Sequence, residues 1–499
     1  MSYLQKISEF QNISVTPTSY DDHRIKGDIS LERETDTLKF HLIFSYSDRI
    51  EADQNLAGLV LAMPAINFTL FSKKLTLNFP ASKSDVSAIS EFVRINNREV
   101  FINKLARRRY EFFRQEYVPR DEDITEENSN GNTLVSATSQ YVDTPRKIQG
   151  GSNAVLSSGG KESLLSYGML KEIDPETHAF YFNESGGHWL TAKTAYDYYS
   201  AEFSNVHKVW SNVDRFYRYV LRNMRILDQR VMNMKTDTYP VQLFIFPVYV
   251  MSMIPVAIEH GIRGAVLGDE FDDPSDMQPF HGIMHYYGIY DQTLDFNRYM
   301  SGYLHSKGID FTVWSAVYPI TGGVVENILI KRYPDLFRLQ RSCHSCRSVN
   351  GKIVPCGKCS KCLGILMFVL SAGGDPHQIL YSTESIENLK ENVSRERMRL
   401  DTDELNYMKA KLGFIEADDM DRLQHVSGMH LLPDEHQLFQ HVPDAYRDGI
   451  MKIISPVCAT FILLYRRGMA PIRKTVILPS SRLPGCCMRN IPQGAPCSP

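Results

Sequence analysis

The sequence lacks several features that would assign it to a specialised class of protein. Neither sign of charge is in excess, because 55 Lys and Arg residues face 58 Asp and Glu residues, a formal net charge of −3. This balance argues against a chain held on nucleic acid or anionic lipid by bulk charge. No charged segment followed by an apolar run opens the chain, so we expect no secretory signal. One uncharged run, residues 238–258, is broken by Pro240, Pro247 and Pro255, and we interpret it as buried core rather than a membrane span.

The cysteines do not have the distribution of a disulfide framework. There are nine, an odd number, and five of them lie between residues 343 and 362. Clustered cysteines in a long chain indicate a metal site, whereas disulfides are typical of small secreted domains. With 43% apolar and 23% charged residues the chain has the composition of a globular protein. We therefore expect a cytoplasmic protein.

The N-terminal part predicts an α+β domain over residues 1–120. Apolar residues alternate with mostly polar ones over 38–46, which indicates a half-buried strand, and 27–32 supplies its hairpin partner. Helical spacing follows over 87–117, with a basic face that includes Arg94 and Arg98; we interpret it as a solvated helix. The acidic, Asn-rich segment that follows predicts a linker over 121–150.

The remainder of the chain predicts an α/β domain and a helical region. Short apolar runs at 153–156, 178–185 and 264–270 alternate with helical stretches, which favours a mainly parallel sheet covered on both faces over 151–380. Residues 381–470 are expected to be mainly helical. Residues 471–499 are rich in Pro, Gly and Ser without an apolar period, and we expect disorder.

The loop after the strand at 153–156 carries the most informative motif. Glycines let the backbone approach an anion closely, and the N-terminus of the following helix offers unpaired N–H groups. Serine hydroxyls and a lysine add further donors and a cation. The candidate nucleotide-binding residues of this loop are Ser157, Ser158, Gly159, Gly160, Lys161, Glu162 and Ser163. The alternative is a Ser/Gly-rich turn without a ligand.

The loop does not match a Walker A motif, because Glu162 follows Gly160-Lys161, and no G-x-G-x-x-G is present. It resembles the PP-loop, S-G-G-x-D-S, of the ATP pyrophosphatase superfamily, with Lys161 at the free position and Glu162 in place of the usual Asp. The resemblance implies a HUP-type parallel sheet. It also implies ATP cleavage between the α- and β-phosphates, with transfer of AMP to a substrate oxygen.

The cysteine cluster predicts structural zinc. Zn²⁺ takes four soft ligands in a tetrahedron, and C-x2-C steps bring two thiolates to one ion. Cys356, Cys359 and Cys362 are the expected ligands, and Cys343 and Cys346 compete for the fourth position. A closed four-sulfur site leaves no position for substrate, so we assign it to folding.

Together the two motifs resemble 7-cyano-7-deazaguanine synthases, which carry a similarly placed zinc site. The whole layout, over about residues 25–380, resembles more closely the ATP-dependent UDP-N-acetylmuramoyl-L-alanyl-L-glutamate epimerase family, although GDEFDDPSD at 268–276 departs from it. This resemblance implies that a substrate carboxylate, that of the terminal L-Glu of UDP-MurNAc-L-Ala-L-Glu or a relative, is adenylated and its α-carbon inverted. The alternatives are another PP-loop ligase or nucleobase-modifying enzyme, and a zinc-stapled binding protein whose loop is degenerate.

Further polar residues follow the predicted strands. Asp269 and Glu270 come after the strand at 264–267, where carboxylates could hold Mg²⁺ against ATP phosphates; the alternative is a solvated acidic loop. Glu184 and His188 follow the strand at 178–183 and are candidates for the adenine or substrate pocket, with an ordinary loop as the alternative.

A last set of residues is assigned to catalysis. Lys161 is expected to stabilise the leaving pyrophosphate together with Mg²⁺. His281 and His285 stand four residues apart, so in a helix they would share a face and could serve as general acid and base. Two pocket-lining histidines without a catalytic role are the alternative.

Overall fold

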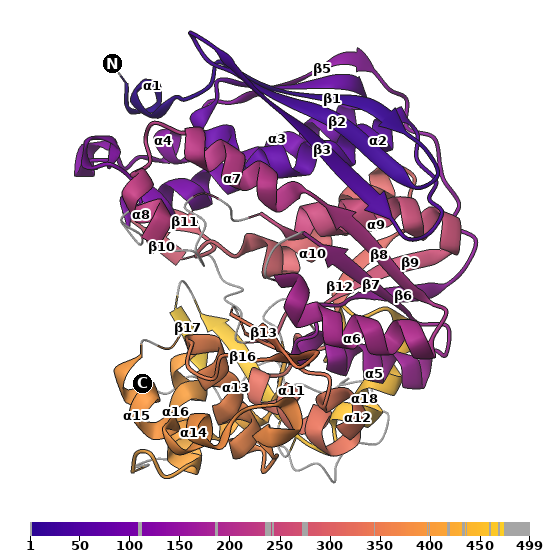
Figure 1. Cartoon of the computed structure of the whole chain (residues 1–499), viewed down its shortest axis with the longest axis vertical. Coiled ribbons are helices and arrows are strands. Elements are labelled where there is room, and N and C mark those ends of the chain that lie inside the picture. Colours follow the sequence, from indigo (N-terminus) through magenta and orange to yellow (C-terminus); the bar gives the residue numbers. More distant parts are fainter. Residues whose placement is uncertain are drawn as a thin grey trace.

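A computed structural model describes most of the chain. The described residues are 2–107, 112–184, 188–234, 241, 244–271, 278–343, 345–396, 398, 400–416, 420–431, 435, 437–458, 461–467 and 470–473. The molecule is elongated, with the N-terminal strands and helices at one end and the C-terminal helices at the other (Figure 1).

A single sheet of ten strands organises the fold, in the order β12-β9-β6-β7-β8-β3-β2-β1-β4-β5. The strands are β1 (Asn12–Tyr20), β2 (Arg24–Glu32), β3 (Thr37–Tyr46), β4 (Lys74–Ala81), β5 (Leu134–Gln140), β6 (Ser152–Leu156), β7 (His178–Asn183), β8 (Val206–Ser211), β9 (Ile262–Leu267) and β12 (Thr312–Ser315). Strands β8, β3, β2 and β1 pair antiparallel, and all other neighbours pair parallel. The predicted α/β class and the predicted hairpin, now β2 and β3, are confirmed.

Successive residues of the central strands belong to two different hydrophobic cores. Ala154 of β6 lies in one core and its neighbour Val155 in the other, and Ala265 and Val266 of β9 divide in the same way. This follows from the alternation of side chains across a strand, and both faces of the sheet must therefore be covered.

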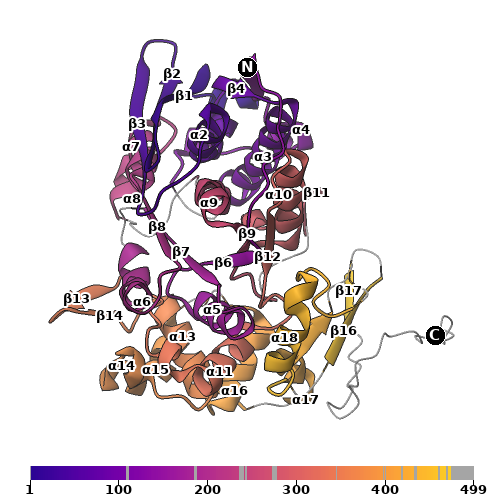
Figure 2. The same cartoon turned by 90° about the vertical axis from the view of Figure 1, so that its right-hand side faces the viewer.

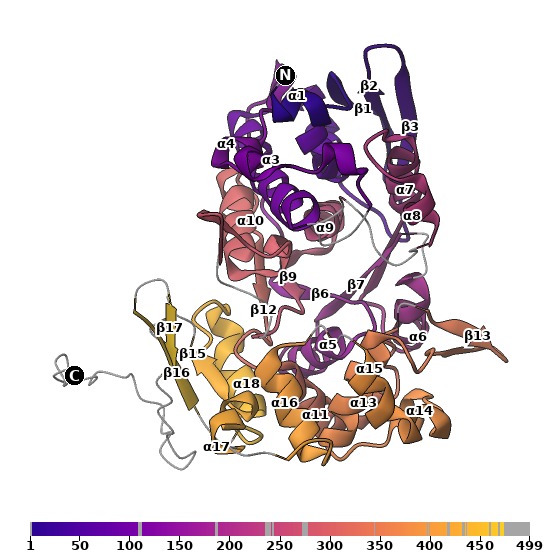
Figure 3. The same cartoon turned by 90° about the vertical axis from the view of Figure 1, so that its left-hand side faces the viewer.

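Helices cover both faces of the sheet, which separates the two cores. On the first face, inside the curve that the sheet makes around α2 and α9 (Figure 2), lie α2 (Gln54–Ala62), the 3₁₀ helix η1 (Met63–Phe71), α3 (Lys83–Val100), α7 (Val213–Asn223), α9 (Phe246–His260) and α10 (Leu294–Ser306). On the second face lie α5 (Lys161–Ile173), α6 (His188–Glu202), α11 (Gly322–Arg332), α13 (Ser360–Ser371), α15 (Leu389–Arg395), α16 (Thr402–Lys411) and α18 (Asp444–Ile454) (Figure 3).

One helical run of the described residues, Gln54–Phe71, is long and apolar enough to cross a membrane, but 94% of it is buried in the first core. It is the core helix of this face. In the uncharged run at 238–258, residues 246–258 belong to α9, which is packed into the same core.

The segment predicted as a linker, 121–150, contributes ordered elements. It contains α4 (Glu126–Asn130) and β5, which pairs parallel with β4 as an edge strand of the sheet. The sheet also runs without a break across the boundary predicted at residue 151. The division into domains stays a prediction.

Residues 381–470 are helical in large part, as predicted, but they also contain strands. The elements here are α14 (Thr383–Glu387), α15, α16, α17 (Met420–Leu423), η7 (Gln424–Ser427), β15 (Met429–Leu431), α18, β16 (Phe461–Arg467) and the start of β17 (Ala470–Arg473). The tail predicted to be disordered lies, from residue 474 on, outside the described residues. The remaining short elements are α1 (Tyr3–Ile7), the π-helix η2 (Phe101–Ala106), η3 (Gln115–Tyr117), η4 (Asp121–Asp123), α8 (Gln229–Met234), η5 (Tyr290–Gln292), α12 (Pro334–Phe337) and η6 (Pro376–Ile379).

Candidate functional site

The glycine loop joins β6 to α5 at the carboxyl end of the parallel strands. β6 ends at Leu156 and α5 begins at Lys161. After β6 the chain builds β7 and β8 on one side and then β9 and β12 on the other. The loop therefore lies where the strand order reverses, which is the place where open α/β sheets bind ligands.

The loop requires glycine at position 159, and α5 begins directly after Gly160. Gly159 has φ +77°, in the left-handed region, and a Cβ there would lie 2.5 Å from the carbonyl oxygen of Thr191. Gly160 is the N-cap of α5, and Ser158 before it is exposed. The first amides of a helix have no intrahelical acceptor and carry a partial positive charge. This arrangement can bind an anion beside the hydroxyl of Ser158.

Lys161 lies beneath the loop rather than on its surface. Its side chain is 4% exposed, and its Nζ forms ion pairs with Glu162 and Glu270. The ring of Phe368 lies 5.1 Å from Nζ. Although burial favours the neutral amine, these two carboxylates raise the pKa of Lys161 well above its usual value. Its charge is already paired in this arrangement, so its expected role at the pyrophosphate stays a prediction.

A third carboxyl group belongs to this buried cluster. Glu326 of α11 is buried, and its Oε2 accepts a hydrogen bond of 3.0 Å from Gln340 Nε2. Burial raises the pKa of Glu326 to about 8, against the opposing effects of Gln340 and of the Lys161 charge. Glu326 is therefore largely protonated at neutral pH. The sequence analysis did not single out Glu326. Its position inside the apolar helical run GGVVENILI could have indicated a buried carboxyl group.

Asp269 and Glu184 follow strands β9 and β7, as predicted, but each is hydrogen-bonded to a different helix. Asp269 follows β9 and is 1% exposed, and its Oδ2 accepts a hydrogen bond of 2.8 Å from Asn297 Nδ2. Glu184 follows β7 and accepts a hydrogen bond of 2.6 Å from the Tyr249 hydroxyl. His188 begins α6, and its side chain lies outside the described residues. The magnesium and pocket roles of these residues stay predictions.

The helical face predicted for His281 and His285 is wrong. The segment is a hairpin of β10 (Gln278–Phe280) and β11 (Ile283–His285), in which Phe280 pairs with Ile283. His281 and Gly282 form its two-residue turn, both with positive φ, of 49° and 80°. His281 is exposed at the tip, while His285 at the far end is fully buried. The hairpin thus separates the two side chains that a helix would have brought together.

The cysteine cluster has the geometry of a four-ligand metal site. The Sγ atoms of Cys343, Cys356, Cys359 and Cys362 all lie within 4.8 Å of one another. The pairs Cys343–Cys359 and Cys356–Cys362 are separated by 3.9 and 3.8 Å. A tetrahedron of sulfur atoms 2.3 Å from zinc has edges of about 3.8 Å, so the four residues fit Zn²⁺.

The structure selects the fourth ligand that the sequence left open. Cys343 belongs to the four-sulfur set and Cys346 does not. The Cys343 Sγ accepts hydrogen bonds of 3.2 Å from the backbone N–H groups of Ser345 and Cys356. Neighbouring thiols, with this support, lower the pKa of Cys343, as a thiolate ligand requires.

The cluster lies beside the glycine loop. Arg341, two residues before Cys343, donates its backbone N–H to the Gly159 carbonyl oxygen over 2.9 Å. The Arg341 guanidinium donates to the carbonyl oxygen of Ile353 over 2.7 Å, in the hairpin of β13 (Arg347–Val349) and β14 (Lys352–Val354) that carries the chain to Cys356. A metal held by the cluster would therefore also hold the segment on which the loop rests.

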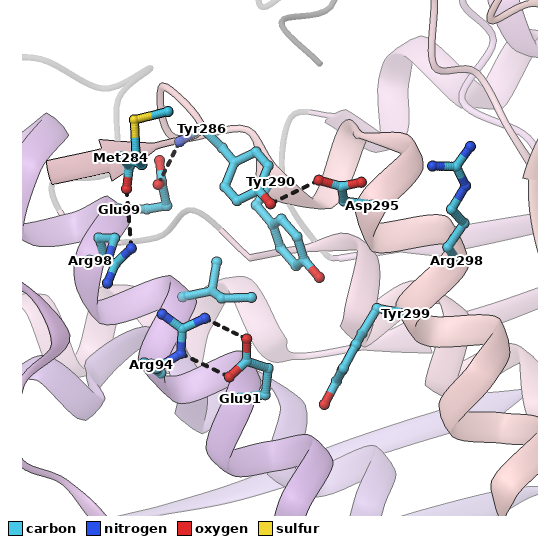
Figure 4. A pocket seen from close by; sticks show the side chains of 11 residues that line it. Glu91, Arg94, Arg98, Glu99, Met284, Tyr286, Tyr290, Asp295, Arg298 and Tyr299 are labelled. Atoms are coloured by element: carbon cyan, nitrogen blue, oxygen red, sulfur yellow. Dashed lines mark hydrogen bonds and ion pairs between the residues drawn. The ribbon is translucent and has the colours of Figure 1, made fainter. Parts of the chain in front are cut away.

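A pocket of about 510 Å³ lies elsewhere, between α3, β11 and α10 (Figure 4). It is lined by Glu91, Arg94, Ile95, Arg98, Glu99, Met284, Tyr286, Tyr290, Asp295, Arg298 and Tyr299. Arg94 pairs with Glu91, and Arg98 pairs with Glu126, so these two members of the predicted basic face do not form a free cationic surface. On α10, Asp295 lines the pocket while Asn297 bonds Asp269, so the helix separates this pocket from the loop.

No protein-family model matches this chain, and neither a curated protein nor a solved structure matches it.

Proposed function

We propose that the protein binds ATP at the loop of residues 157–163 and transfers AMP to a substrate carboxylate, releasing pyrophosphate. The observation that carries the proposal is the position of this loop. A Ser/Gly-rich turn leads into the N-terminus of α5 at the point where the order of five parallel strands reverses. Both the helix N-terminus and the reversal point favour a bound phosphate group.

The residues around the loop fit a magnesium nucleotide. The amides of the first turn of α5 and the hydroxyls of Ser158 and Ser163 would hold phosphate oxygens. The Glu162 carboxylate, 31% exposed, would be the Mg²⁺ ligand at the motif position where the PP-loop has Asp. Bound Mg²⁺ supplies charge stabilisation for the leaving pyrophosphate. Lys161 and Glu270 beneath the loop would position the Glu162 side chain, since Lys161 Nζ bonds both carboxylates.

The acceptor that we propose follows from the resemblance to the epimerase family. A carboxylate oxygen of the substrate attacks the α-phosphorus, the bond to the bridging oxygen breaks, and pyrophosphate leaves. The mixed anhydride removes the negative charge that suppresses acidity at the neighbouring α-carbon, which can then lose its proton and regain one on the other face. Water finally releases AMP and the inverted substrate. We place this reaction in the cytoplasm, where ATP is present and thiols stay reduced.

The test is incubation with ATP, Mg²⁺ and UDP-MurNAc-L-Ala-L-Glu in D₂O. We expect AMP and pyrophosphate as products and one deuterium at the glutamate α-carbon. Ser158→Ala should abolish both, because it removes a hydroxyl from the loop. Ser87→Ala, at an exposed position of α3, is the matched control and should leave both unchanged.

The products separate the alternatives. AMP and pyrophosphate without deuterium would keep the loop assignment and exclude the epimerase. ADP and orthophosphate, or full turnover by Ser158→Ala, would contradict the proposed site.

A further inference from the structure

A second group of metal-ligating side chains lies at the sheet edge opposite the glycine loop. Asp48 follows β3, His207 is the second residue of β8, and His260 is the last residue of α9. One ligand atom from each of the three residues lies within 4.8 Å of the other two. The chain thus brings together, from three distant segments, two imidazoles and a carboxylate.

The imidazole groups of this cluster are buried at the atoms that face one another. The His207 side chain is 2% exposed, and its Nδ1 pairs with Asp48 Oδ2 over 3.2 Å. The Nε2 atom of His260 is buried and has no hydrogen-bond partner among the described residues. A buried polar atom left without a partner is costly, so this nitrogen needs an explanation.

A neighbouring histidine fixes which nitrogen of His207 faces the group. His178 Nδ1 lies 2.8 Å from His207 Nε2, and the two rings stack at 5.1 Å. When His207 carries its proton on Nε2 and donates it to His178, the Nδ1 lone pair faces the Asp48 carboxylate. A cation between the lone pair and the carboxylate turns this repulsive contact into two bonds. Metal-ligating histidines in proteins are commonly oriented by such a bond from their other ring nitrogen.

The carboxylate and the second histidine are also oriented. Ser47 Oγ donates a hydrogen bond of 2.6 Å to Asp48 Oδ2. A backbone hydrogen bond joins His260 to Arg49, in the same loop that carries Asp48. These contacts hold the donor atoms toward one another before any ion is bound.

We propose that Asp48, His207 and His260 bind a divalent transition-metal ion, with Zn²⁺ as the probe that fits best. Imidazole nitrogen and carboxylate oxygen are ligands that Zn²⁺ takes at about 2.0–2.2 Å, with ligand atoms about 3.4 Å apart in a tetrahedron. Small movements of the Asp48 loop and of the end of α9 would close the present separations to this value. Water would complete the coordination.

The position of this site indicates its role. β8 pairs antiparallel with β3 from Phe44↔Ser211 to Tyr46↔Val209, and this short ladder joins the parallel and the antiparallel parts of the sheet. The ligands come from the loop after β3, from β8 and from the end of α9. An ion bound there would link the parallel and the antiparallel part of the sheet where β3 pairs with β8, away from the nucleotide loop.

The test is the zinc content of the purified full chain, measured by mass spectrometry after removal of metal, reloading with Zn²⁺ and dialysis. Asp48→Asn and His260→Gln should each lose one zinc equivalent per chain relative to the unsubstituted protein. His281→Gln, an exposed histidine at the tip of the β10–β11 turn, is the control and should lose none. Cys359→Ala should lose a different equivalent, so the double variant Cys359→Ala/Asp48→Asn should lose both.

The Asp48 side chain is 27% exposed in a surface loop, so Asp48→Asn provides a folded variant even if His260→Gln does not fold. A second measurement keeps the two metal sites apart. With the cysteine site filled by Zn²⁺, added Co²⁺ should give weak visible bands without the near-ultraviolet charge-transfer band of thiolate ligation, and Asp48→Asn should remove them. The proposal would be overturned if Asp48→Asn and His260→Gln held as much zinc as the control His281→Gln. Cobalt bands that persist in Asp48→Asn would also overturn it.

Discussion

The backbone N–H of Arg341 donates a hydrogen bond of 2.9 Å to the carbonyl oxygen of Gly159. This bond fastens the chain that enters the cysteine cluster to the glycine loop. The candidate metal site and the candidate nucleotide site are therefore parts of one structural unit. A change at the sulfur atoms should therefore also alter the conformation of the loop.

The first prediction concerns the choice of metal ligands. Cys359→Ala should remove the zinc equivalent of the cluster and lower the free energy of unfolding by several kcal/mol. The reason is that the free energy of metal binding at such a site contributes directly to the stability of the fold. Cys346→Ala, at a cysteine outside the four-sulfur set, should retain the metal. Zinc analysis and urea unfolding of the two variants check this. Loss of zinc in Cys346→Ala together with full occupancy in Cys359→Ala would reverse the ligand assignment.

The second prediction concerns the buried ion pairs beneath the loop. Lys161→Met should lower the free energy of unfolding by about 3–5 kcal/mol, because it leaves the carboxylates of Glu162 and Glu270 without their cation. Lys193→Met breaks an exposed pair with Asp197 and should cost less than about 1 kcal/mol. Urea titrations measure both. A similar small effect in the two variants would show that the Lys161 pairs contribute no more than surface pairs.

The third prediction concerns the glycine requirement of the loop. Gly159→Ala should destabilise the protein by about 1–2 kcal/mol from the left-handed backbone alone, and by more because its Cβ would meet the Thr191 carbonyl. Gly151→Ala, where a Cβ would meet nothing within 4 Å, should change stability by less than about 0.5 kcal/mol. Thermal unfolding of both variants is the measurement. An unchanged melting temperature for Gly159→Ala would mean that the loop has a different conformation.

The fourth prediction concerns pH. The folded protein holds the proton of Glu326 up to about pH 8, whereas an unfolded chain loses it near the ordinary value of 4.5. The folded state therefore binds more protons between these values, and the free energy of unfolding decreases as pH rises, by up to about 1.4 kcal/mol per unit. Glu326→Gln should flatten this decrease, and the exposed Glu384→Gln should not. Urea unfolding at several pH values would contradict the assignment if Glu326→Gln kept the full slope.

Much of the fold could be predicted from local pattern. The alternation over 38–46 predicts β3, and the apolar runs at 153–156 and 264–267 predict β6 and β9, because burial on one face or on two leaves a direct signature in sequence. The order of strands has no such signature. The pairing of β3 with β8 joins residues more than 160 positions apart, and this pairing makes one sheet of parts that the sequence divides into domains.

The candidate site shows the same limit. The loop and the cysteine cluster are contiguous motifs and could be located, whereas the burial of Lys161 against Glu270 depends on β9 lying beside β6. His281 and His285 show a different failure. Their spacing suits a helix. However, Gly282 directly after His281 favours a two-residue hairpin turn, and the chain forms this turn.

The most direct test of the central claim, that residues 157–163 bind the nucleotide, is calorimetric titration with ATP and Mg²⁺. We expect binding to the unsubstituted chain and equal affinity for Ser87→Ala. Gly160→Val should lose binding, because a side chain there would lie against the Glu162 carboxylate and the Ser158 hydroxyl. Absence of heat with the unsubstituted chain, or unchanged affinity in Gly160→Val, would contradict this claim.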